Sequence, residues 1–213
     1  MSRQHGETTT MKTLYIFLTR SGTLLSNLVY SLTGAQYTHI SLAFDEDLST
    51  LYSSTRKNGY TMFPAGPSRE YLNRGVFLMR ENIPCALYAL EVTDEAYTRA
   101  KRRTHHMMHH GELYRFNSLG LLLCWMHIRW QRRRHYFCSQ FVSEVLQKSG
   151  ALELPKPSTL MHPSDYAELP ELRCLYRGTL AGLPQRQSME LGEGESVMGL
   201  YLNVLLGAVK GRA

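Results

Sequence analysis

The sequence is short of cysteine and has no long hydrophobic run. Its 213 residues include four cysteines without CxxC or Cys/His zinc spacing, which argues against a zinc ribbon or a disulfide framework and favours a reducing compartment. No stretch approaches the ~20 apolar residues needed to cross a bilayer. The apolar segment Leu14 to Leu18 is too short for the core of a signal peptide. We therefore expect a cytoplasmic protein.

The overall composition is that of an ordinary globular protein. Apolar residues make up 43% and charged residues 20% of the chain, which is enough to build a sizeable core. The net charge is +6 and the pI about 9.2. A basic balance favours anionic partners such as acidic peptides, phospholipid head groups or nucleic acid, but it does not choose among them. A solvated basic face explains it equally well.

The composition changes along the chain and divides it into three parts. Residues 1–11 are polar and are expected to be disordered, and residues 12–183 form the domain. Residues 184–213 combine a polar linker with the apolar segment Met198 to Val209. We expect that segment to pack on the domain or on a second copy in a homodimer. Contact with a membrane surface is the alternative, which its lack of Lys and Arg weakens.

Local patterns predict an alternation of strands and helices. Strands are indicated by aromatic and β-branched runs or by period-two alternation, and helices by apolar residues at helical spacing between start and stop signals. The predicted strands are Leu14–Thr19, Tyr37–Phe44, Leu48–Thr55, Phe77–Met79, Ala86–Val92 and Leu172–Tyr176. The predicted helices are Leu24–Leu32, Asp94–His110, Leu119–Trp130 and Ser139–Ser149.

Cys138 stands at the start of a predicted helix. Aromatic residues precede it and an amphipathic segment follows, in YFCSQFVSEVL. The helix macrodipole favours an anion at that end, and the thiolate is the nucleophilic form of cysteine. A buried structural cysteine is the bland alternative and the commoner one. Cys85, Cys124 and Cys174 lie within predicted strands or mid-helix and are weaker candidates.

A thiolate needs a base, and His39 is the best placed of nine histidines. It lies on a predicted strand, on the face opposite Ile40, Leu42 and Phe44. If residues 45–47 form the hairpin turn, Ser53 lies directly opposite His39 and can orient its imidazole. A one-residue slip of register would remove that contact. The carboxylates of the turn, Asp45, Glu46 and Asp47, are reserve candidates for this role.

These segments together resemble a known superfamily. The His strand THISLAFDEDL, the polar position in LYSS and the Cys helix YFCSQFVSEVL are similar to the circularly permuted branch of the NlpC-type papain-like proteins, in which His precedes Cys. The YiiX-like bacterial branch, a neighbour of the lecithin–retinol acyltransferase-like proteins, is the most similar. TRSGTLLS, TRKNGY, YRFNSLGLL and PSDYAELPELRCLYRGTL add to the likeness, which spans roughly residues 12 to 182.

The resemblance implies an α+β fold with a central antiparallel sheet and the Cys helix packed against it. It implies thiol chemistry on an amide, ester or thioester, with Cys138 as nucleophile, His39 as base and no cofactor. The third position, often His, Glu, Asn or Gln in the family, is Ser53 here. Residues expected to contact substrate near these segments are Arg20, Ser21, Tyr37 and Tyr136.

Three functions stay open at this stage. A peptidase- or amidase-like cysteine hydrolase is preferred, acting on a small peptide, acyl-amide or lipid-like substrate. Acyl transfer or lipid and ester hydrolysis on the same fold is the alternative, and a catalytically degenerate binding module is the third.

Two further clusters carry weaker signals. His105, His106, His109 and His110 have i, i+4 spacing on a predicted helix but lack an intervening carboxylate, so an exposed helix end is preferred over a metal site. The second cluster has four arginines interleaved with Trp130 and Tyr136: Arg129, Arg132, Arg133 and Arg134. It lies within no nucleic-acid motif, and we expect it to form a cationic rim beside the active site rather than a specific nucleic-acid interface.

Overall fold

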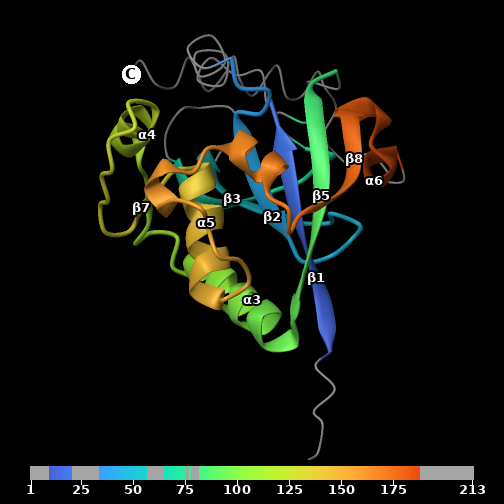
Figure 1. Ribbon diagram of the computed structural model, residues 1–213, viewed down its shortest axis with the longest axis horizontal. Coiled ribbons are helices and arrows are strands. Elements are labelled where there is room, and N and C mark those ends of the chain that lie inside the picture. Colours follow the sequence, from blue (N-terminus) through green and yellow to red (C-terminus); the bar gives the residue numbers. More distant parts are fainter. Residues whose placement is uncertain (1–9, 21–33, 57–64, 75–76, 78–81, 188–213) are drawn as a thin grey trace, which may run out of the picture.

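The protein has an α+β fold built on one six-stranded antiparallel sheet. The computed structural model describes residues 10–20, 34–56, 65–74, 77 and 82–187. The strand order is β4-β3-β2-β1-β5-β8, so that β1 and β2 lie in the middle and β4 and β8 at the edges (Figure 1). A second sheet is a short parallel pair, β6 and β7.

The helices and strands have clear bounds in the described residues. The strands are β1 Met11–Thr19, β2 His39–Ala43, β3 Leu51–Arg56, β4 Ala65–Glu70, β5 Pro84–Thr93, β6 Arg115–Phe116, β7 His135–Tyr136 and β8 Arg173–Thr179. The α-helices are α3 Asp94–His109, α4 Ser118–Trp125, α5 Cys138–Ser149 and α6 Pro184–Gln187. Short 3-10 turns cover Ser158–Leu160, Pro163–Glu168 and Leu180–Gly182.

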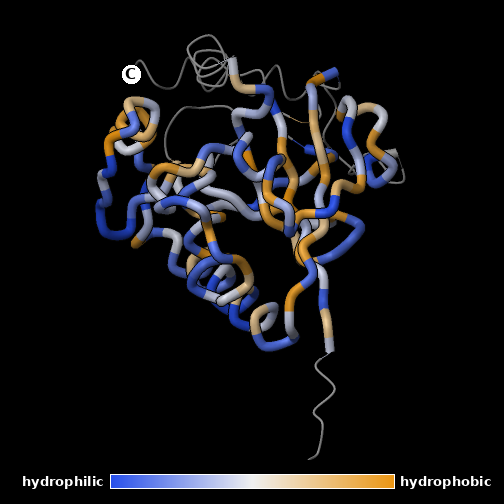
Figure 2. Tube along the Cα trace, viewed as in Figure 1, coloured by the Kyte–Doolittle hydropathy of each residue, from blue (hydrophilic) through white to orange (hydrophobic). Residues whose placement is uncertain are grey.

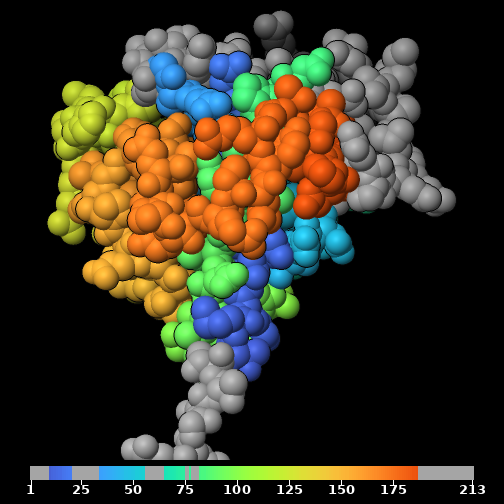
Figure 3. Space-filling view, turned by 45° about the vertical axis from the view of Figure 1, so that its right-hand side comes forward, coloured from blue at the N-terminus to red at the C-terminus, as the bar shows by residue number. Residues whose placement is uncertain are grey.

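Strand β1 supplies both faces of the sheet with buried side chains. Leu14, Ile16 and Leu18 belong to a large cluster that includes the inner faces of α3 and α5, whereas Tyr15 and Phe17 belong to a smaller cluster on the other face. A central strand that is covered on both sides is apolar at nearly every position, and Figure 2 shows this apolar centre as orange tube. The space-filling view shows the described segment that follows α5, including β8, packed against the rest of the described structure (Figure 3).

The two long helices have capped ends. Thr93 accepts a hydrogen bond from the Ala96 N–H at the start of α3. Gly150 follows α5 with φ of 71°, in the left-handed region that glycine adopts without strain. Helix α3 is joined to α5 by Arg103, whose guanidinium donates to Glu144.

Most of the predicted elements are present, with shifted ends. Strands β1, β5 and β8 and helices α3 and α5 lie where local patterns place them. Helix α4 ends at Trp125 rather than residue 130, because His127 takes a left-handed conformation with φ of 57°. Of the strand predicted over 77–79, only Phe77 is described, and it is helical.

Other predictions fall outside the described residues. These are the helix predicted over 24–32, most of the linker and the apolar segment 198–209. In the part of the chain that the structure does describe, none of the helices is long and apolar enough to cross a membrane.

Candidate functional site

Helix α5 places Cys138 at its first residue. The preceding Phe137 is the N-cap and makes no side-chain cap hydrogen bond, so the amide N–H groups of the first turn are available to an anion. The first turn carries no acidic side chain that would oppose a negative charge. Cys138 is only 8% exposed, which shields the sulfur from bulk water.

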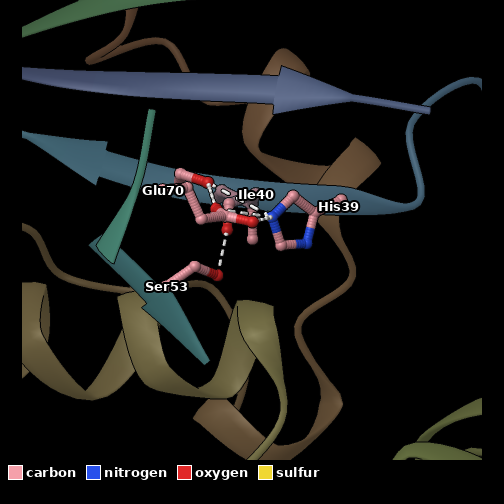
Figure 4. A network of polar contacts seen from close by, with 5 residues as sticks. His39, Ile40, Ser53 and Glu70 are labelled. Carbon is pink, nitrogen blue, oxygen red and sulfur yellow. Dashed lines mark hydrogen bonds and ion pairs between the residues drawn. The ribbon is translucent and has the colours of Figure 1, made fainter. Parts of the chain in front are cut away.

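His39 is the first residue of β2, and its imidazole is held by a carboxylate. Strand β2 pairs with β1 so that His39 lies opposite Thr19. The Nε2 atom of His39 is 2.9 Å from Oε2 and 3.1 Å from Oε1 of Glu70. Ser41 donates to the same carboxylate at 2.7 Å. Figure 4 shows the imidazole pointing at Glu70.

The electrostatic environment keeps His39 protonated at neutral pH. Burial alone lowers the pKa of this imidazole, but the charge of Glu70 and hydrogen bonds to Cys138 and Glu70 outweigh it and raise the pKa to about 10. Cys138 is itself one of the groups that raise the His39 pKa, so the thiol lies near the ring. Because Nε2 faces Glu70, Nδ1 is the nitrogen that remains for the sulfur. Glu70, His39 and Cys138 therefore form a carboxylate–imidazole–thiol series.

Two serine hydroxyls of β3 form hydrogen bonds to backbone carbonyls near the point where Cys138 approaches β2. Among the described residues the pairing of β2 with β3 is confined to Leu42 opposite Tyr52. Beyond it, Ser53 donates to the Ile40 carbonyl at 2.8 Å and Ser54 donates to the Tyr136 carbonyl at 2.7 Å. The second bond ties β3 to the segment just before α5, and so brings the start of the helix to the His39 end of the sheet.

The register predicted for the hairpin is wrong, and with it the orienting role of Ser53. Leu42 lies opposite Tyr52, so continuing that register puts Ser53 across from Ser41 rather than from His39. The shift arises because the turn is longer than residues 45–47: Leu48 is fully buried with φ of 53° and does not begin the return strand. The hydroxyl of Ser53 bonds to Ile40 (Figure 4), and Glu70 holds the imidazole instead.

Glu70 is the functional residue that the sequence analysis missed. It ends β4, an edge strand that was not predicted, and it lies opposite Leu51 on β3. One signal was available, because Glu70 is the first acidic residue after the hairpin turn. A chain that continues as an antiparallel meander brings its next strand alongside β3, and a carboxylate there can reach the sheet position of His39.

The reserve carboxylates stay in the turn. Asp45 accepts from the Ser49 N–H at 2.8 Å, and Glu46 and Asp47 are exposed. Their role is local to the loop that carries Leu48.

The four residues expected to contact substrate have different surroundings. Tyr136 and Tyr37 are almost fully buried, and the Tyr37 N–H donates to Ser164 Oγ at 3.3 Å. Arg20 lies at the end of β1, where its N–H donates to the Pro84 carbonyl. Ser21 lies outside the described residues. Tyr136 lies closest to the nucleophile along the chain, two residues before it.

The other three cysteines have no comparable setting. Burial raises the pKa of Cys85 and of Cys124 to about 12, which keeps both thiols protonated. The sulfur of Cys124 is 3.7 Å from His162 Nε2, but burial lowers the pKa of that histidine, so it is not a charged partner. Cys174 is exposed on β8.

A cleft of about 850 Å³ lies next to β6 and the beginning of α4, and its lining does not include Cys138, His39 or Glu70. It is bounded by the first residue of β4, by β6, by the beginning of α4 and by His135 of β7, three residues before Cys138. Its lining combines the aromatic rings of Tyr114, Phe116 and Trp130 with the cationic Arg115 and Arg132, against one carboxylate, Glu112. The cleft therefore suits a molecule with an apolar part and a negative charge.

The histidines at the end of α3 do not form a metal site in the described structure. His105 contacts the Tyr52 ring, with ring centroids 5.8 Å apart, and His106 lies against His110 at 4.6 Å. Within residues 10–187, wherever the structure is described, no three metal-ligating side chains converge.

Comparison with known proteins returns no relative. No protein-family model, curated protein or solved structure matches the chain. Function is therefore inferred from the side chains around Cys138.

Proposed function

We propose that the chain is a papain-like cysteine hydrolase of the circularly permuted type. In this proposal Cys138 is the nucleophile, His39 the base and Glu70 the group that orients His39. The observation that carries it is the His39 imidazole, bound to Glu70 through Nε2 and hydrogen-bonded to Cys138 at the first residue of a helix. A carboxylate in this place can also stabilise the imidazolium ion, which a serine hydroxyl cannot.

The reaction follows from the positions of these groups. Because His39 is already protonated, Cys138 reacts as the thiolate partner of the imidazolium, and this thiolate attacks the carbonyl carbon of the substrate. The carbonyl oxygen becomes an oxyanion, to which the Cys138 N–H at the uncapped start of α5 donates. His39 then gives its proton to the leaving amine or alcohol, and a thioester remains on Cys138.

Water completes the cycle. His39, neutral after protonating the leaving group, removes a proton from a water molecule and the hydroxide attacks the thioester carbonyl; Cys138 then leaves as the thiolate beside the protonated His39, and the acid product is released. Glu70 keeps its charge throughout and holds the imidazole in one orientation. An acceptor amine or alcohol in place of water would give acyl transfer through the same thioester.

Labelling with an iodoacetamide-type probe tests the nucleophile. We expect the probe to modify Cys138 at neutral pH faster than it modifies the exposed Cys174, because only Cys138 faces an imidazolium. Cys138→Ala should abolish the fast labelling, and Cys174→Ala should leave it unchanged. Fast labelling that persists in Cys138→Ala and maps to another cysteine would show that the nucleophile is misassigned.

Turnover of a small panel of amides, esters and thioesters tests the chemistry. An active hydrolase should release acid from at least one class, and Cys138→Ala should release none. Adding an amine acceptor to the same reaction distinguishes hydrolysis from acyl transfer by the product formed. Fast labelling without turnover of any acyl compound would support the degenerate binding module instead.

A further inference from the structure

Helix α4 presents an unusual amount of apolar surface to solvent. Leu119, Leu122 and Met126 have exposed fractions of 53%, 51% and 60%, and Ile128 just beyond has 46%. Positions 119, 122 and 126 follow helical spacing, so they share one face of α4. These four residues are four of the seven large hydrophobic side chains that are exposed in the described part of the chain. An exposed apolar group of this kind marks an interaction surface.

The stretch of chain around α4, residues 113–143, carries nearly all of the protein's net positive charge. Residues 113–143 contain five of the 24 basic residues and none of the 18 acidic residues, so the rest of the chain has a net charge of only +1. Arg129, Arg132, Arg133 and Arg134 are all exposed. They lie on the connection between α4 and β7, directly after Ile128.

Helix α4 lies at the edge of the part of the chain that the structure describes. Figure 1 shows α4 at the periphery of the molecule, away from the six-stranded sheet, and Figure 2 shows apolar α4 followed by a strongly hydrophilic connection. We call the four apolar side chains and the four arginines the α4 surface. The cleft of about 850 Å³ shares Leu119 and Arg132 with this surface, so a partner that covers the surface also meets the cleft.

We propose that the α4 surface docks on an anionic lipid membrane. Apolar side chains enter the boundary between head groups and acyl chains, while arginines beside them bind the negative head groups. Trp130, which is partly exposed between the arginines, has the ring type that prefers this boundary. A nucleic acid would use the arginines but not Leu122 and Met126, and a second copy of the chain would meet the same positive charge.

Docking on a lipid membrane would also change how acyl compounds reach the cleft. The cleft would open toward the membrane surface, and acyl compounds dissolved there would reach it without crossing water. The docking itself does not depend on the reactivity of Cys138, so the two proposals stand or fall separately.

Cosedimentation with vesicles tests the docking. Full-length protein should bind vesicles containing about 30 mol % phosphatidylglycerol in phosphatidylcholine, bind pure phosphatidylcholine far more weakly, and lose most binding when salt rises from about 0.1 M to about 1 M. Arg132→Gln with Arg133→Gln should weaken the binding roughly 30-fold. Leu122→Ser with Met126→Ser should weaken it at least tenfold, because both apolar contacts are lost.

Matched controls separate this surface from general effects. Leu175→Ser replaces an exposed leucine on β8, and Arg102→Gln replaces an exposed arginine on α3; neither should change vesicle binding. Cys138→Ala should bind vesicles like the wild type, and the α4 variants should keep the far-ultraviolet circular dichroism spectrum of the wild type, which shows that they fold.

Four outcomes would overturn the proposal. Equal binding to charged and uncharged vesicles, or none to either, would remove the anionic membrane as partner. Loss of binding in the arginine pair but not in Leu122→Ser with Met126→Ser would indicate a purely electrostatic surface, of the kind that suits nucleic acid. A change in the protein's own sedimentation mass in the α4 variants, without a change in vesicle binding, would indicate a second copy of the chain.

Discussion

Glu70 controls the charge of His39, and its removal should change the pH profile of the reaction. The alkaline limb of activity should follow the His39 pKa of about 10 in the wild type. In Glu70→Gln burial is no longer offset by the carboxylate charge, so we expect the limb to move to lower pH and kcat/KM at neutral pH to fall roughly 10²-fold. The pH dependence of hydrolysis, or of probe labelling at Cys138, measures both effects.

Ser53 is the matched control for Glu70. Its hydroxyl donates to the Ile40 carbonyl and not to the imidazole. Ser53→Ala should therefore cost about 1 kcal/mol of stability through the lost hydrogen bond and leave the alkaline limb in place. A limb that moved in Ser53→Ala and stayed in Glu70→Gln would return the orienting role to Ser53.

The same ion pair makes folding depend on pH. The pKa of His39 is about 10 in the folded protein against 6.5 for an ordinary histidine, so between these values the folded state holds a proton that the unfolded state releases. The stabilisation is complete below about pH 6.5 and is lost as pH rises toward 10. We expect the difference in unfolding free energy between the wild type and Glu70→Gln to be largest near pH 6 and to shrink with rising pH. Urea unfolding at several pH values measures it, and a difference that grew with pH would contradict the assignment.

At the scale of elements, the end of α5 depends on a single glycine. Gly150 has φ of 71°, and a Cβ there would meet Arg99 Nη2 at an ordinary contact distance of 3.4 Å. The cost of Gly150→Ala is therefore one of backbone conformation rather than space, and should be about 1 kcal/mol. Gly150→Asn should lose less, because asparagine tolerates the left-handed region. Urea unfolding compares the two, and equal losses would point to a steric cause.

The helices could be predicted from the sequence because their signals are local. In α5 the apolar face, the aromatic residues before Cys138 and the final glycine all lie within fifteen residues of sequence, 136–150. Cys138 and His39 could be chosen for the same reason: each stands at a recognisable position of its own element. The contact between them depends on how the sheet and helix meet, which periodicity does not contain.

The hairpin register and β4 could not be predicted, because neighbouring strands decide both. Leu48 is buried in the core with a positive φ. Burial of its side chain offsets the unfavourable backbone conformation, but no turn rule predicts a positive φ for leucine. The sequence of β4, AGPSRE, has no β-branched or aromatic residue and contains a proline, which an edge strand accommodates. The third member of the candidate site lies on that strand.

At the scale of the whole molecule, the two apolar clusters share the strands of one sheet, so the described domain should unfold as a unit. Ile16 faces the first cluster and Phe17 the second, where its ring lies 6.2 Å from Phe77. Ile16→Ala should cost about 2–5 kcal/mol and Phe17→Ala about 3–5 kcal/mol. Each should shift the urea midpoint equally by far-ultraviolet circular dichroism and by tryptophan fluorescence.

Tryptophan fluorescence also tests whether α4 unfolds together with the sheet. The two tryptophans, Trp125 and Trp130, end α4 and follow it, so their emission reports the α4 surface, whereas circular dichroism reports the whole backbone. Coincident midpoints in both variants would show that the surface is stabilised by the sheet. A tryptophan transition at lower urea, unmoved by Ile16→Ala, would show that α4 opens independently of the sheet.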